Sequence, residues 1–257
     1  MNQFKITKKI HFLNSIGIIF VVVVLWTLVL RSRAHTILIP SIPAVLNSFV
    51  VILTKTSSYY QIYLTIFRSL TGFFLAFICS LILGILMWSS KRIKNFIHDV
   101  GIFTQAVSIL VWILFLIVIF GVISDWPAIL VPFFISFPII ANNIEIGIEN
   151  VDKKLVEMAH SFKADGDQIY REIIFPSLKP YLYSAIRSGI SLSLKVSVVA
   201  EAFSGGNGIG YQIIYNYNQF NQQRAIAWAL LIVIIMIFID WVVLAKIESK
   251  EYSSTAV

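Results

Sequence analysis

The sequence predicts an all-helical integral membrane protein with six transmembrane helices. Of its 257 residues, 58% are hydrophobic and 13% are charged, whereas soluble domains carry roughly 25% charged residues. Uncharged apolar runs recur along the chain at about the 20 residues that a helix needs to cross a bilayer. Lysines and arginines also gather in alternate connecting segments. These three observations exclude an ordinary soluble enzyme or binding domain.

The first element is an uncharged run, residues 12–30, which follows a basic stretch and ends at Arg31. The apolar region of a signal peptide has about 7–15 residues, so we expect a retained first span. Residues 1–60 are predicted to be this span and an outer interfacial segment. In that segment, Pro43 and the apolar residues after it predict a short helix lying in the interface.

Five more spans are predicted within a single domain, residues 61–245, before a charged tail of residues 246–257. Their expected ranges are 62–88, 100–124, 127–144, 181–202 and 225–245. The fourth holds Pro132 and Pro138, where we expect kinks, because neighbouring groups in a membrane protein can satisfy the carbonyls that proline frees.

The distribution of basic residues predicts the orientation. Six spans place both termini on one side, and the N-terminus, residues 91–94, the loop of residues 150–180 and the tail hold thirteen lysines and arginines. The segments on the other side hold four. By the positive-inside rule both termini are cytoplasmic. This rule also accounts for the net charge of +7, so nucleic acid is not expected as a partner.

The cytoplasmic loop of residues 150–180 is polar but keeps helical order. Its first helix is predicted from an apolar stripe at helical spacing, formed by Val151, Leu155, Ala159 and Phe162. Asp165 and Gln168 predict a capping box at the start of a second helix, which Pro176 and Pro180 should end. Two short amphipathic helices suit a groove on a soluble partner.

Four residues of this loop match a known pattern of Glu-Ala-Ala, three residues, Gly, nine residues and Ile-x-Leu-Pro. The matching positions are Glu157, Ala159, Ile173 and Pro176. The loop therefore resembles the EAA loop of bacterial ABC importer permeases. Met158 and Phe175 are apolar replacements. Lys163 stands at the glycine position, and we expect Gly166 to supply the turn instead.

Further motifs occur in the order found in permeases that import nitrate, taurine, alkanesulfonate and bicarbonate, and the chain is similar to these proteins over about residues 37–248. The motifs are LIPSIP at 38–43, RSLTGF at 68–73, Phe120-Gly121, Phe137-Pro138 with Asn142, and Ala200-Glu201 followed by Gly205, Gly208 and Gly210. Members of this family often carry prolines in the third span. Residues 105–114 have none, so we expect a straighter third span here.

The resemblance implies a type I ABC importer permease of the bacterial cytoplasmic membrane. Two permeases, most simply a homodimer, would form the pathway. Two copies of a separate ATPase would hold ATP and Mg and grip the EAA loops, and an external or periplasmic solute-binding protein would deliver the solute. The implied ATPase-coupling residues are Glu157, Met158, Ala159, Lys163, Gly166, Ile173 and Pro176. The chain itself has no GxxxxGK[ST] sequence, and we expect no catalytic, cofactor or metal site in it.

Charged residues inside membrane spans are rare and usually functional, and they supply the candidate pathway residues. These are Arg68, Lys195 and Glu201, together with Asn142. Arg68 and Glu201 lie at similar depth, so they either pair with each other or contact the solute. Lys195 follows Pro180 by fifteen residues, about 22 Å of helix, which is too deep for its ammonium to reach the cytoplasmic interface. The glycines at 205, 208 and 210 form either a tight turn or an outer gate.

The charge balance favours a small anion, such as a sulfonate, nitrate or bicarbonate. If Arg68 pairs with Glu201, Lys195 has no obvious partner in its own chain. A neutral solute, such as a pyrimidine or a vitamin precursor, fits if Lys195 is neutral or bonds to carbonyls. An ion-coupled secondary transporter would rely on intramembrane carboxylates, and here only Glu201 and Asp240 qualify. A membrane enzyme would need a nucleophile facing a base, and no pattern predicts such a pair.

Overall fold

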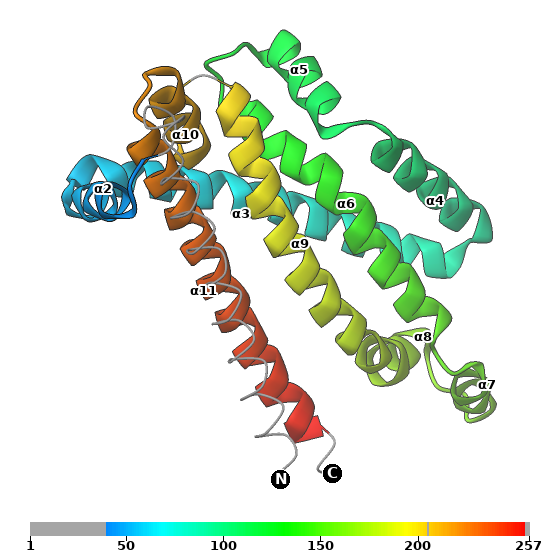
Figure 1. Ribbon diagram of the computed structural model, residues 1–257. Coiled ribbons are helices and arrows are strands. Elements are labelled where there is room, and N and C mark those ends of the chain that lie inside the picture. The colour runs from blue at the N-terminus through cyan, green and yellow to red at the C-terminus, as the bar shows by residue number, and fades with distance from the viewer. Residues whose placement is uncertain (1–39, 205, 255–257) are drawn as a thin grey trace.

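The computed structural model describes residues 40–204 and 206–254, and every regular element among them is a helix (Figure 1). The helices are α2 (Ile42–Thr54), α3 (Thr56–Ser89), α4 (Lys91–Ala106), α5 (Ile109–Phe120), α6 (Trp126–Glu149), α7 (Lys153–Ser161), α8 (Gly166–Ile169), the π-helix η1 (Tyr170–Ile174), α9 (Phe175–Phe203), α10 (Ile209–Asn218) and α11 (Gln222–Ser254). The predicted all-helical class is confirmed. The expected first span, residues 12–30, lies outside the described residues.

Three long helices, α3, α6 and α9, pack against one another and form the centre of the fold. Phe73 of α3, Ile140 of α6 and Ala185 of α9 are buried in one apolar cluster. A buried polar contact also joins α6 to α9, in which the hydroxyls of Ser136 and Ser193 lie 2.8 Å apart. Both prolines expected to kink the fourth span lie inside the single helix α6 and are buried.

The segment predicted as the third span is broken, so the expectation of a straighter helix is wrong. The axes of α4 and α5 differ by 92° at a break of two residues. Val107 and Ser108 there adopt extended backbone, with ψ angles of 127° and 143°. Ser108 occupies the N-cap position of α5, and its carbonyl accepts from the N–H groups of Val111 and Trp112. The extended backbone at these two residues therefore interrupts this segment without proline.

Among the described residues, three helices are long and apolar enough to cross a membrane, and the bent α4–α5 pair would count as a fourth if it forms one span. The three are residues 56–87 of α3, the whole of α6, and residues 222–242 of α11. With 29 residues, α9 has sufficient length, but its composition is more polar. Six spans and cytoplasmic termini therefore stay predictions.

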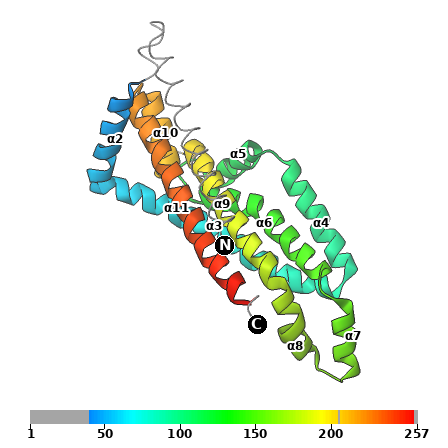
Figure 2. The same ribbon diagram turned by 60° about the horizontal axis from the view of Figure 1, so that its bottom comes forward.

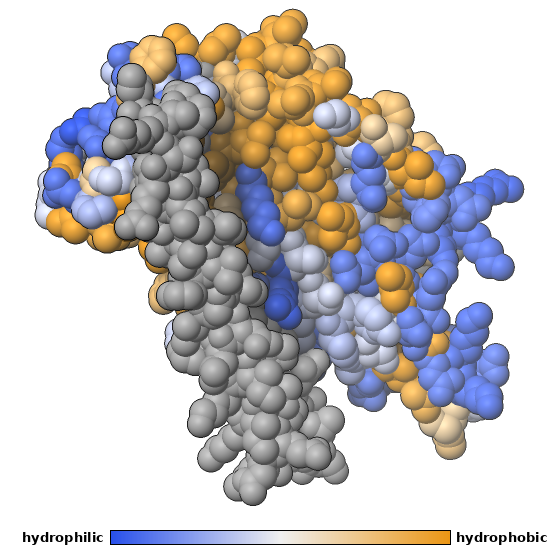
Figure 3. Space-filling view, in the orientation of Figure 1, coloured by the Kyte–Doolittle hydropathy of each residue, from blue (hydrophilic) through white to orange (hydrophobic). Residues whose placement is uncertain are grey.

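The bundle has two distinct ends, which we call the α7 end and the α10 end. In Figures 1 and 2, α7 and α8 lie at one extremity, whereas α2, α10 and the start of α11 gather at the other. A buried cluster that includes Val45, Ile209 and Trp228 joins these last three helices. Figure 3 shows a broad hydrophobic surface over α5 and neighbouring helices, with hydrophilic residues gathered around α4 and α7.

Candidate functional site

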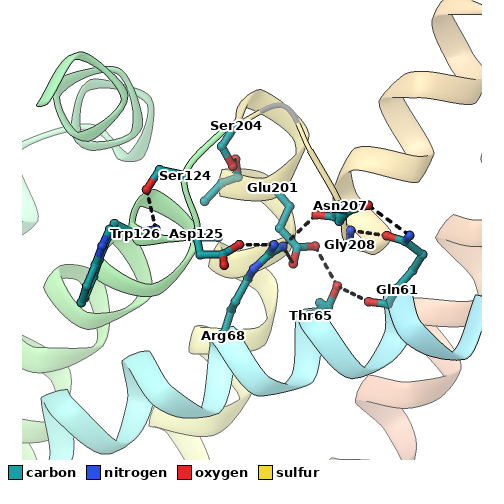
Figure 4. Close-up of polar contacts among 12 residues, drawn as sticks. Gln61, Thr65, Arg68, Ser124, Asp125, Trp126, Glu201, Ser204, Asn207 and Gly208 are labelled. Carbon is teal, nitrogen blue, oxygen red and sulfur yellow. Dashed lines mark hydrogen bonds and ion pairs between the residues drawn. The ribbon is translucent and has the colours of Figure 1, made fainter. Parts of the chain in front are cut away.

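A network of polar side chains, which we call the Arg68 cluster, lies at the α10 end (Figure 4). Its members come from α3, from the turn between α5 and α6, and from the end of α9 with the loop that follows. They are Gln61, Thr65, Arg68, Asp125, Glu201 and Asn207. The cluster therefore ties together segments that are far apart in the sequence.

Glu201 is fully buried, with 0% of its surface exposed, and both carboxylate oxygens are satisfied. Its Oε1 accepts from Nη1 of Arg68 at 2.9 Å. Its Oε2 accepts from Oγ1 of Thr65 at 2.7 Å and from the Gly210 N–H at 3.1 Å. Burial of a carboxylate costs free energy unless it is paired and hydrogen-bonded, and this arrangement supplies both conditions.

Arg68 serves three partners at once. Besides Glu201, its Nη1 donates to the Asn207 carbonyl at 2.7 Å, and its Nη2 forms an ion pair with Asp125. The two carboxylates differ in environment, because the Asp125 side chain is 65% exposed while that of Glu201 is buried. The expected pairing of Arg68 with Glu201 is present. Since Arg68 is only 6% exposed, neither residue offers a surface to a solute in this conformation.

Two glycines let the α9–α10 loop fold tightly over Glu201. Gly208 has a φ of +113°, and a Cβ there would overlap the Glu201 carboxylate. A Cβ on Gly210 would overlap the Val198 carbonyl oxygen. Any other residue would push the loop away from α9, which supports the tight-turn interpretation. Gly205 lies outside the described residues, and a gate role for this loop stays a prediction.

At the α7 end, the loop after α6 forms a helix whose end has Schellman geometry. The Asp152 side chain accepts from the Lys154 N–H at the start of α7. At its end, the N–H of Ala164 donates to the Ala159 carbonyl and that of Lys163 to the His160 carbonyl. Lys163 occupies the left-handed position of this motif, with φ +59°.

The expectation that Gly166 supplies this turn is therefore wrong. The left-handed residue is Lys163 itself, at the position where the EAA pattern has glycine, and Gly166 is the first residue of α8. A lysine in this conformation costs roughly 1–2 kcal/mol, because its Cβ approaches the following carbonyl. The turn thus keeps its shape without the residue that favours it.

The expectation that Pro176 and Pro180 end the second helix is also wrong. The predicted capping box between Asp165 and Gln168 starts α8, and the chain then continues through η1 into α9, which contains both prolines. Proline has no N–H to donate within a helix. The backbone opens into the wider π-turn just before Pro176, and the Phe175 N–H donates to the Tyr170 carbonyl. The loop is therefore continuous with α9.

Packing divides the predicted apolar stripe of α7 into two sets. Val151 is buried and Ala159 is half-buried against Ile169, Ile174 and Leu178, so these residues hold the loop onto the base of α9. Leu155 and Phe162 of the stripe instead point outward, as does the motif residue Met158, and the Phe162 side chain is 81% exposed. Of the other motif residues, Ile173 lies in the inward set, while Glu157 and Pro176 are exposed.

Lys195 lies on the uncovered face of α9 and has no ion pair or hydrogen bond to the described residues. The other cations that the sequence places within spans have partners, since Arg68 binds Glu201 and Nε of Arg187 lies 3.5 Å from the Asp240 carboxylate of α11. Ser184, Arg187, Ser188 and Ser191 share the face of Lys195 at helical spacing. This face, the α9 polar stripe, is exposed or half-buried along its length.

The structure does not bring the four candidate pathway residues together. Asn142 is exposed in a separate cavity of about 250 Å³ between α4 and α6, whose polar lining includes His98, Gln105 and Glu145. Lys195 lies on α9, and Arg68 and Glu201 are buried at the α10 end. Sequence reasoning missed Asp125 and Thr65 as members of the Arg68 cluster. For Asp125 a signal existed, because it is the sole acid in its turn.

The chain matches the family model described as binding-protein-dependent transport system inner membrane component over residues 72–245. It is 27% identical over 224 residues to a putative ABC transporter permease of Methanocaldococcus jannaschii, covering 85% of this chain and 83% of that protein. A nitrate import permease of Synechocystis is 29% identical over 160 residues, 62% of this chain and 57% of the relative.

A putative aliphatic sulfonates transport permease of Escherichia coli is 32% identical over 113 residues, 44% of this chain and 42% of the relative. Among solved structures, an inward-facing methionine ABC transporter matches with a TM-score of 0.65 and 17% identity, covering 76% of this chain and 99% of that chain. At this identity the likeness shows the fold.

Proposed function

Because the chain belongs to the family of binding-protein-dependent transport system inner membrane components, we propose that it forms half of the pathway of an ATP-driven importer for a small anion. The relatives named for nitrate and aliphatic sulfonate import support an anionic solute. Within this chain, the observation that carries the proposal is Lys195, a cation on α9 without a partner among the described residues.

The α9 polar stripe explains where the anion would pass. A membrane helix does not expose several polar side chains and a lysine to lipid, because unpaired charges in hydrocarbon cost several kcal/mol. Apart from the contact of Arg187 with Asp240 of α11, the stripe would therefore face water or another subunit. A second copy of this chain, related by a twofold axis, would enclose the two stripes around one aqueous path. Each copy would contribute one Lys195 ammonium, and an anion would offset the repulsion between them.

The α7 end would receive the ATPase. Leu155, Met158 and Phe162 form an exposed apolar patch beside Glu157, which suits a groove on a soluble subunit. The inward residues of the same loop pack on the first turns of α9. Two ATPase subunits that hold ATP and Mg, one for each permease, would therefore move α9 whenever they move α7. A solute-binding protein would deliver the anion to the α10 end, outside the cytoplasmic membrane.

Uptake assays test the anion. In proteoliposomes that contain the permease, its ATPase and its binding protein, ATP-dependent uptake of nitrate, an alkanesulfonate, bicarbonate and neutral uracil is compared. We expect Lys195→Met to lower anion uptake by at least tenfold and Lys195→Arg to retain most of it. Lys91→Met, which removes the same charge from an exposed site at the start of α4, is the matched control and should retain uptake. Uptake of the anion by Lys195→Met at the rate of the parent protein, or preference for uracil, would refute the proposal in favour of a neutral solute.

A further inference from the structure

A second polar cavity, of about 210 Å³, opens at the α10 end; it adjoins the Arg68 cluster at Gln61 and shares no residue with the α9 polar stripe. Its walls are the corner between α2 and α3, one side of α10 and the start of α11. Its lining includes Lys55, Ser57, Ser58 and Arg224. We call it the outer cavity.

The outer cavity concentrates positive charge. Lys55 and Arg224 both line this cavity, although they are far apart in the sequence. Neither side chain has an ion pair with the described residues. The described carboxylates at this end are those of Asp125 and Glu201, and Arg68 holds both. Residues 1–39 contain no aspartate or glutamate.

Helix dipoles add to this charge. Lys55 is the N-cap residue of α3, and Arg224 stands in the first turn of α11. A helix N-terminus carries a partial positive charge, so it favours anions and disfavours cations nearby. Neither helix has an acidic residue in its first turn. Two helix starts and two cations thus meet at one cavity, and the described residues offer no negative charge to compensate them.

Hydrogen-bond donors are also free. The hydroxyls of Ser57 and Ser58 make no hydrogen bond to the described residues, although Ser58 is 5% exposed. An oxyanion with several acceptor oxygens could bind both hydroxyls together with the two cations. The chemistry is that of a phosphate, which accepts from arginine, lysine and hydroxyl donors.

The surroundings identify a lipid as the source of that phosphate. Tyrosines with exposed side chains flank the cavity on α3 and α10, and tyrosine is enriched at membrane–water interfaces. They are Tyr59, Tyr60, Tyr63, Tyr215 and Tyr217. Helix α2, which Figure 1 shows nearly end-on while α11 runs down the page, exposes Leu46 and Val50. Such a helix is suited to lie in the headgroup region.

We propose that the outer cavity binds the phosphate headgroup of an anionic phospholipid. Lys55 and Arg224 would flank the phosphate, the hydroxyls of Ser57 and Ser58 would donate to it, and the acyl chains would leave past α2. The headgroup would then hold α2 and α3 to α10 and α11. Which leaflet supplies the lipid rests on the proposed orientation, whereas binding itself does not.

Native mass spectrometry of the purified full-length protein in a neutral detergent tests this, with phosphatidylglycerol or phosphatidylcholine added. The test variant is Lys55→Gln with Arg224→Gln. The matched control is Lys91→Gln with Arg92→Gln, which removes the same charge from an exposed site at the start of α4. Each basic side chain near an anionic lipid contributes roughly fivefold in affinity, so we expect about 25-fold weaker retention of one phosphatidylglycerol per protomer in the test variant. The control should retain that lipid.

Separate outcomes distinguish a lipid from free phosphate, and either of these from a protein partner. Displacement of the lipid by millimolar inorganic phosphate would support the anion site and name free phosphate as its ligand. Equal retention of phosphatidylglycerol by parent and test variant, or equal retention of phosphatidylcholine, would overturn the proposal. So would loss of solute-binding-protein affinity with lipid retention unchanged, which would make the cavity a protein-docking site. No arm measures anion transport, so failure here leaves the proposed function standing.

Discussion

Replacement of Arg68 by methionine should destabilise the α10 end far more than loss of its exposed partner, the Asp125 carboxylate. Methionine keeps much of the side-chain volume but removes the guanidinium. Glu201 would then keep the Thr65 hydroxyl at 2.7 Å and the Gly210 N–H at 3.1 Å, with no counter-charge and no exposed surface. Breaking a buried ion pair by removing one partner costs about 3–5 kcal/mol. For a chain of this size we expect the Tm to fall by roughly 6–20 °C.

The exposed partner should behave differently. The Asp125 side chain is 65% exposed, so water can replace Arg68 around it. An exposed ion pair is worth about 0–1 kcal/mol, and Asp125→Asn should therefore change the Tm by only a few degrees. The double variant Arg68→Met with Glu201→Gln removes both buried charges. Because it leaves no uncompensated carboxylate, it should be more stable than Arg68→Met alone.

The assay is thermal unfolding of the four purified proteins in one detergent, followed by tryptophan fluorescence. The expected order of Tm is parent close to Asp125→Asn, then the double variant, then Arg68→Met. Equal effects of Arg68→Met and Asp125→Asn would show that burial of Glu201 is not what makes the pair strong. A double variant no more stable than Arg68→Met would show that an uncompensated charge is not the cause.

Four further substitutions, one of them a control, probe the remaining features. Gly210→Ala should cost about 1–3 kcal/mol in thermal unfolding, since its Cβ would overlap the Val198 carbonyl, whereas Gly166→Ala, with open space around it, should be neutral. Lys163→Gly should raise stability by about 1 kcal/mol and leave ATPase binding intact, and a lower Tm would contradict the left-handed assignment. Glu157→Lys should abolish ATP-dependent uptake in a protein that still inserts, and normal uptake with normal ATPase assembly would contradict the coupling role.

The sequence predicts the helices well where one local signal dominates. Apolar runs with charged ends locate α3 and α6, and the pairing of Asp165 with Gln168 locates the start of α8. The pairing of Arg68 with Glu201 was predictable because intramembrane charges need partners and both residues lie at similar depth. The contact of Asp125 with Arg68 could not be predicted in this way, because the turn that brings Asp125 to Arg68 depends on how α5 and α6 pack.

The wrong expectations share a physical cause. The effect of a proline or a glycine depends on the backbone around it, so neither residue alone fixes where a helix ends or turns. Pro176 does not end a helix here, because η1 absorbs the missing donor with a wider turn. Lys163 adopts the left-handed conformation that glycine prefers, because two Schellman hydrogen bonds and packing of Ala159 and Ala164 hold it there. Conversely, a segment without proline breaks at Ser108.

The continuity of α9 connects these features. Its first turns carry Leu178, which packs under α7, its middle carries Lys195, and its far end carries Glu201. A rigid displacement of α7 therefore reaches Glu201 through one uninterrupted helix. At that point Arg68 of α3 holds α9 by a buried contact and the α5–α6 turn by an exposed one. The exposed contact with Asp125 is the weaker of the two, so relative motion should part Arg68 from Asp125 and keep α3 and α9 together as one moving body.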